Sequence, residues 1–278
     1  MPPLTSIEAT SITFLIIFTL LSLPSLHIWT TYIRAHYPFL YGFYGAFILC
    51  SSRIASSISE LIFHSTSYTN RHAAIAYIIT LSIGYIGLLE CESALFVSWA
   101  ERHIEFNPTQ QEVHGKVRLL NVVGMGLVVY GSSKYDENGV VDGTAVACIQ
   151  AGTIIFLVLT VIQTAYIAFG WATYVRMSNT LALLSTTMLF LYVRIIFGVY
   201  STFHREVSMI NFSTSNVKYL VGCMLVPETV ALILLIVIGY TNVRSKNFRP
   251  HQNGPPAVAY DFDRLEAAKR GQVSGETA

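Results

Sequence analysis

Six ionisable residues lie inside segments that are otherwise apolar enough to cross a lipid bilayer. They are two arginines and four glutamates: Arg53, Glu60, Glu90, Glu92, Arg194 and Glu228. A charge at the centre of a membrane helix costs roughly 2.5 to 3.5 kcal/mol on insertion scales, whereas one Leu or Ile returns only about 0.5 kcal/mol. Because charges are so expensive there, all six are candidate residues of a ligand pocket within the membrane.

The segments that must position these residues are long and hydrophobic. The chain has 278 residues, of which 53% are hydrophobic and 12% charged, about half the charged fraction of a typical soluble domain. A membrane-spanning helix needs about 20 mostly apolar residues. Seven segments approach or exceed that length, and together they predict an all-α, multi-pass membrane protein: 11–33, 39–63, 73–99, 117–134, 144–170, 180–202 and 217–240.

The basic residues between these segments predict the orientation of the bundle. Eleven fall on one side and four on the other; the four are Arg71, Lys134, Arg205 and Lys218. The side richer in Lys and Arg is normally cytoplasmic, so we expect the N-terminus outside and the C-terminus inside. The tryptophans also gather at predicted cytoplasmic helix ends, where an indole prefers the headgroup level: Trp29, Trp99 and Trp171.

Three of the charged residues fall near one depth. Counted at about 1.5 Å per residue, Arg53 and Arg194 are each about 14 residues from the inner ends of their helices. Glu228 is about 11 residues from the outer end of its helix, which puts all three near the middle of the membrane and able to meet. Glu90 and Glu92 lie nearer the cytoplasm and point about 200° apart, so only one of them can face a given partner.

Two interpretations of this set stay open at the level of sequence. In the first, Arg194 pairs with Glu228, and Arg53 pairs with Glu60 or Glu90, as buried ion pairs that fix how the helices pack. In the second, the residues line a polar cavity. Four glutamates outnumber two arginines, so at least two carboxyl groups need another partner, water or a proton. We favour the cavity for this reason.

The last part of the chain changes character. We divide it into a seven-helix domain, 1–243, and a largely disordered cytoplasmic tail, 244–278, which is polar and rich in charge. The only N-x-S/T sequon begins at Asn211, in a predicted outer loop, and is a glycosylation candidate.

Several classes of protein find no support in the sequence. A net charge of +1 gives no nucleic-acid footprint. His64, His72 and His204 lack zinc-binding spacing, so we predict no metal site and no cofactor. A retinal protein needs a lysine within its seventh helix, and Lys218 stands at the edge. The DRY-like triplet after the third helix and the NPxxY-like segment in the seventh helix, which are typical of hormone receptors, are also absent.

Four short motifs begin at Arg53, Val117, Val193 and Val226 and read RIASSISE, VRLL, VRIIF and VPE. In their order and placement they resemble a fungal family of seven-helix membrane proteins whose function is unassigned. More distantly, Gln150-Ala151-Gly152 and the RIIF of the third motif resemble fragments of the RTA-like, lipid-translocating exporter family. That likeness implies seven helices, an outside N-terminus and lipid export.

These observations lead to three hypotheses. The first is a transporter-like or lipid-handling protein whose mid-membrane pocket accepts an amphipathic or cationic lipophilic molecule, with membrane lipids as its other partners. The second is an intramembrane enzyme of fungal secondary metabolism, a cyclase or isomerase, in which Glu90, Glu92 or Glu228 acts as the acid. The third is a seven-helix sensor or receptor. Whether the chain forms oligomers stays open.

Overall fold

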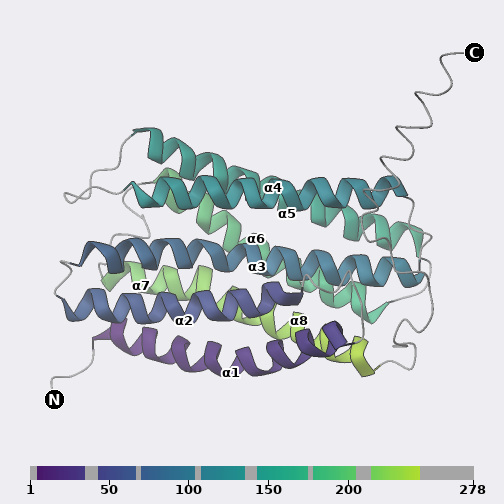
Figure 1. Cartoon of the computed structure of the whole chain (residues 1–278), viewed down its shortest axis with the longest axis horizontal. Helices are drawn as coiled ribbons and strands as arrows, with labels where there is room; N and C mark the ends of the chain where they lie inside the picture. The colour runs from purple at the N-terminus through teal and green to yellow at the C-terminus, as the bar shows by residue number, and fades with distance from the viewer. Residues whose placement is uncertain are drawn as a thin grey trace, which may run out of the picture.

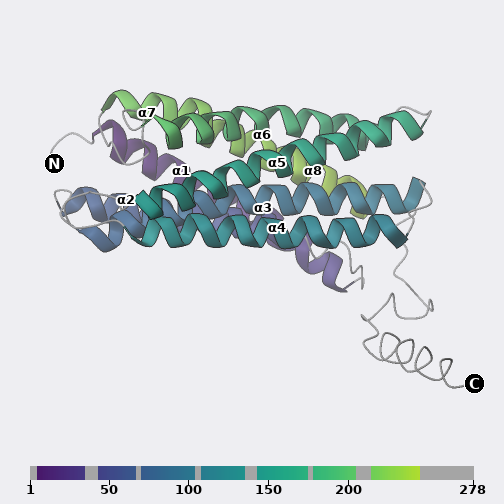
Figure 2. The same ribbon diagram turned by 90° about the horizontal axis from the view of Figure 1, so that it is seen from above.

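The computed structural model describes residues 5–34, 43–66, 70–103, 108–134, 143–174, 178–204 and 214–244. Over these ranges the chain forms an elongated bundle of seven helical rods laid along one axis (Figures 1 and 2), with no β-strand in the described part. The prediction of an all-α, seven-helix fold is therefore confirmed. The rods are α1 (Ser6–Arg34), α2 (Tyr44–Ser65), α3 (Arg71–His103), α4 (Pro108–Ser133), α5 (Gly143–Thr173), α6 (Asn179–Phe203), and a last rod composed of α7 (Thr214–Leu220), a π-helical segment (Val221–Leu225) and α8 (Val226–Arg244).

Six of the rods are long and apolar enough to span a membrane, so the chain is a multi-pass membrane protein. The exception is α4, which begins at Pro108, nine residues before the apolar segment predicted at 117–134. Its first turns carry the polar stretch PTQQEVHGK, which lowers its hydropathy although the helix runs beside α5 over much of its length (Figures 1 and 2). Which side of the membrane each terminus occupies stays a prediction.

α3 occupies the centre of the bundle. It contacts α2, α4, α5, α6 and α8, while α1 closes the far side between α2 and α8. More than half of its apolar stretch is buried, 56%, a larger share than in the other five candidate spans. Any residue on α3 that faces inward therefore lies within reach of several helices at once.

The tightest crossing of α2 and α3 is made by two glycines. A side chain on Gly45 would collide with the backbone carbonyl of Gly87, and a side chain on Gly87 would collide with that of Gly45. Small residues let membrane helices approach backbone to backbone. This close approach carries Arg53, two turns along α2, against the buried face of α3.

The two ends of the bundle are called here the N-terminal end, where α1 begins, and the C-terminal end, where α8 ends (Figure 1). All three tryptophans lie toward the C-terminal end, as their predicted grouping requires. The indole nitrogen of Trp99 donates to the Ser178 hydroxyl (3.0 Å), and that of Trp171 to the Ser185 hydroxyl (3.0 Å).

Candidate functional site

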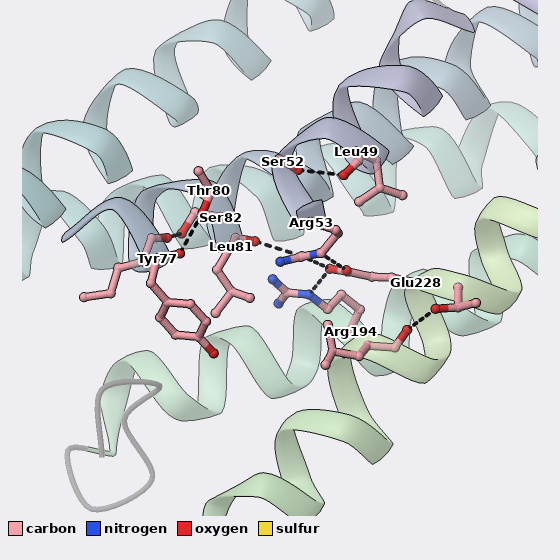
Figure 3. Close-up of polar contacts among 12 residues, drawn as sticks. Leu49, Ser52, Arg53, Tyr77, Thr80, Leu81, Ser82, Arg194 and Glu228 are labelled. Atoms are coloured by element: carbon pink, nitrogen blue, oxygen red, sulfur yellow. Dashed lines mark hydrogen bonds and ion pairs between the residues drawn. The ribbon is translucent and has the colours of Figure 1, made fainter. Parts of the chain in front are cut away.

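Three charged side chains from three helices meet inside the bundle, and we call them the charge cluster: Arg53 of α2, Arg194 of α6 and Glu228 of α8 (Figure 3). Arg53 donates to both carboxylate oxygens of Glu228, from Nε to Oε2 (2.7 Å) and from Nη2 to Oε1 (2.6 Å). Arg194 donates from Nε to Oε1 (2.6 Å). The predicted meeting of these three residues at one level is confirmed.

The charge cluster is almost completely enclosed. Glu228 is 0% exposed, Arg53 1% and Arg194 4%. Arg53 also donates from Nη2 to the backbone carbonyl of Leu81 on α3 (2.9 Å), while its Nη1 is buried without a hydrogen-bond partner in the described part of the chain. The guanidinium of Arg194 lies over the ring of Tyr85, 5.6 Å from its centroid, a cation–π contact.

Each arginine of the charge cluster lies against a glycine. A Cβ atom on Gly84 of α3 would fall 2.9 Å from Nη2 of Arg53, and one on Gly198 of α6 would fall 3.1 Å from Nη1 of Arg194. Both distances are shorter than ordinary carbon–nitrogen contacts. The two glycines therefore leave the space that the planar guanidinium groups occupy.

The helix that carries Glu228 is irregular just before this residue. Val221–Leu225 form a π-helical turn, and the N–H of Val226 donates to the carbonyl of Val221, five residues earlier. Pro227 follows, and because proline has no N–H it cannot continue the regular helical bonding. π-turns of this kind occur frequently at functional sites.

Glu60 does not join the charge cluster. The Ser11 hydroxyl of α1 donates to its Oε2 (2.6 Å), so its carboxyl group links α2 to α1, and the side chain is half-buried. Of the ion pairs in the first interpretation, that of Arg194 with Glu228 is present, whereas that of Arg53 with Glu60 or Glu90 is wrong, because Arg53 also binds Glu228. Counting depth along one helix could not show which neighbouring helix offered the nearer carboxylate.

Glu90 faces α4 and forms a second polar contact that the sequence did not predict. Arg118 donates from Nε to Oε2 of Glu90 (3.0 Å), and the Asn121 side-chain amide donates to Oε1 (3.1 Å). Arg118 is the second residue of the apolar segment predicted at 117–134. The early start of α4 puts Arg118 inside the helix, about 15 Å from its first residue.

Glu92 is isolated. It is 1% exposed, and neither carboxyl oxygen has a hydrogen-bond partner within the described ranges. It lies on the same face of α3 as Leu81 and Tyr85, with spacings of about three and two turns. As expected, Glu90 and Glu92 face different surroundings.

The remaining predictions concern the glycosylation candidate, the tail and a metal site. Asn211 and the tail 244–278 fall outside the described residues, except for Arg244 at the end of α8. Among the described residues, no group of three His, Cys, Asp or Glu side chains could hold a metal ion.

Fold and charge cluster together define an all-α, multi-pass membrane protein with a buried, two-arginine carboxylate centre. A family model described as a domain of unknown function, DUF7702, matches residues 4–245, and the chain belongs to this family. No curated protein and no solved structure matches the chain. The resemblance to lipid-translocating exporters therefore stays a prediction.

Proposed function

We propose that this protein binds a lipophilic small molecule at the charge cluster and transfers it within or across the membrane. One observation carries the proposal: helices far apart in the sequence bring three charged side chains to one level inside an apolar bundle, and Nη1 of Arg53 has no hydrogen-bond partner among the described residues. Polar groups at this depth are expensive and are typical of substrate pathways.

A purely structural role explains the arrangement less well. A packing lock needs one arginine for one glutamate, and a second buried guanidinium adds a further desolvation penalty of several kcal/mol. Apolar residues of similar volume would hold the helices together as firmly or more firmly. The second arginine is therefore better explained as part of a binding site.

The experiment separates binding from packing by removing all the charges together. The triple variant Arg53→Met/Arg194→Met/Glu228→Leu removes all three charges of the cluster and strands none of them, so we expect it to fold and reach the membrane at the wild-type level. Cells lacking the protein are complemented with wild type or with this variant, and lipophilic metabolites are profiled in cells and medium. We expect the variant to leave those metabolites distributed as in cells without the protein.

A matched control keeps the charge cluster intact. Val193→Met/Ile196→Met changes two exposed apolar residues of α6 beside Arg194, and we expect it to behave as wild type. If the triple variant also restored the wild-type distribution, the charge cluster would be a packing element and the proposal would fail.

One observation favours a second candidate, an intramembrane enzyme. Glu228 is engaged by two arginines and Glu90 by Arg118, whereas Glu92 has no partner among the described residues and is the carboxyl group best placed to donate a proton. The same profiling distinguishes the two. A product absent from both cells and medium in a Glu92→Gln strain supports catalysis, and a product that is merely redistributed supports transfer.

A further inference from the structure

The charges of the cluster do not balance, and this imbalance indicates the chemistry of the bound molecule. We infer that the ligand carries a head group with a single negative charge, a carboxylate on an apolar chain, rather than a cationic one. The inference rests on the proposed function, because it concerns the same site. It departs from our sequence-based expectation, which named an amphipathic or cationic ligand.

The first argument is charge. Two arginines and one glutamate meet in the cluster, so their formal charges sum to one surplus positive charge. Glu60 binds Ser11, and Glu90 binds Arg118 and Asn121. Glu92 has no partner in the described structure, but it lies about 16 Å further along α3 than Leu81, too far to pair with the arginines. A surplus charge inside a membrane is costly, and one monoanion would neutralise it.

The second argument is geometry. Arg194 uses only its Nε in the cluster, and its two terminal nitrogens form no hydrogen bond within the described ranges. Figure 3 shows the guanidinium groups of Arg53 and Arg194 close together beside the carboxylate of Glu228. Adjacent guanidinium groups with free N–H donors match the two oxygens of a carboxylate. The side chain of Arg194 is still 5% accessible, so a head group would reach it first.

The third argument is the group of buried apolar side chains beside these donors. Toward the N-terminal end, the charge cluster borders a small hydrophobic cluster separate from the main core, formed by Tyr77, Ile78, Leu81 and Met224, with partly buried Phe197 and Leu220 packed against it. Met224 belongs to the π-helical turn, where regular helix packing is interrupted. An apolar chain attached to the head group would meet hydrocarbon side chains here, as an acidic lipophile requires.

The test compares ligands that share one chain and differ only in the head group. Binding of oleate, methyl oleate, oleylamine and oleoyl lysophosphatidate to the purified full-length protein is measured in lipid nanodiscs of neutral phosphatidylcholine. We expect oleate to bind at least tenfold more tightly than the ester, the amine and the phosphate. Arg194→Gln should weaken oleate binding at least tenfold and leave methyl oleate unchanged.

Two further variants make the result decisive. Arg118→Gln removes a basic residue of the bundle outside the charge cluster, and we expect it to bind oleate as wild type does, which excludes a general attraction of anions. Gly198→Leu keeps all three charges but fills the space beside Nη1 of Arg194, so it should also weaken oleate binding even if Arg194→Gln fails to fold.

The outcomes separate this inference from the proposed function. Tightest binding of oleylamine or of the phosphate, lost in Arg194→Gln, would overturn the inference and leave the proposed function standing. Equal binding of all four ligands, unaffected by Arg194→Gln and Gly198→Leu, would overturn both.

Discussion

Glu228 and Glu92 are two carboxyl groups with the same degree of burial and opposite surroundings. Glu228 is 0% exposed and accepts three hydrogen bonds from two arginines, whereas Glu92 is 1% exposed and accepts none in the described part of the chain. Both lie on apolar helices that pack against one another. Burial alone therefore does not tell whether an acid inside the membrane is a partner in a network or an isolated group.

The two acids differ in hydrogen bonding because different side chains lie at their two depths in the bundle. Arg53 and Arg194 reach the level of Glu228 from two other helices, and glycines at 84 and 198 leave room for their guanidinium groups. Glu92 lies about 16 Å further along α3 than Leu81, whose carbonyl accepts from Arg53. A site that combines donors with space is therefore expected to tolerate substitution much less well than an isolated acid.

The largest effect should follow from breaking the network at its centre. Glu228→Gln leaves two buried guanidinium groups without a carboxylate, so we expect the unfolding free energy to fall by about 3 to 5 kcal/mol. Denaturant unfolding in detergent, followed by circular dichroism, measures this loss. A loss below 1 kcal/mol would mean that water or lipid already solvates the two arginines.

A smaller loss should follow from crowding the network without altering a charge. Gly84→Ala places a methyl group 2.9 Å from Nη2 of Arg53 and 2.8 Å from Leu49, and overpacking of this kind costs about 1 to 3 kcal/mol. Gly126→Ala on α4 is the matched control, because no atom lies within 4 Å of its added carbon. Equal stabilities of the two variants would contradict the close fit of Arg53.

The pair of Glu90 and Arg118 should lie between the two extremes. Arg118 has 43% of its side chain exposed, and exposed ion pairs contribute only about 0.2 to 1 kcal/mol. A double-mutant cycle with Glu90→Gln and Arg118→Gln should return a coupling energy in that range. A coupling energy above 2 kcal/mol would show that this contact is shielded from solvent as the charge cluster is.

The smallest effect is expected at the isolated acid. Glu92→Leu removes no hydrogen bond seen in the described structure, so its unfolding free energy should stay within about 0.5 kcal/mol of wild type or rise slightly. The same substitution at Glu228 gives the direct contrast in one assay. A marked loss at Glu92 would reveal a partner, such as a bound ligand or an ordered water.

The helices could be predicted from the sequence because long apolar runs have few other stable structures in a bilayer. Depth could be predicted too, since the rise per residue is fixed, and this was enough to bring Arg53, Arg194 and Glu228 together. The choice of partner could not be predicted, because it depends on how each helix is rotated about its axis. For Glu60 and Glu90 that rotation turns the carboxyl group toward α1 and α4.

The glycines of the site show a second limit of sequence reasoning. Nothing in the sequence distinguishes Gly84 and Gly198 from glycines such as Gly126, whose surroundings are open. The sequence also did not predict where α4 begins. Pro108 and the polar residues after it are typical of a loop, although proline is well suited to the first turn of a helix. For the same reason, the contact of Arg118 with Glu90 was not predicted.

The π-helical turn at Val221–Leu225 also sets the direction of Glu228. A π-turn holds one residue more than an α-turn, so α8 is rotated by about 100° relative to an unbroken helix. The sole acid between the two arginines is thus aimed by five uncharged residues. Deleting one residue from this turn would rotate the Glu228 carboxylate away from Arg53 and Arg194. The charge cluster would then be broken although every ionisable group is still in the chain.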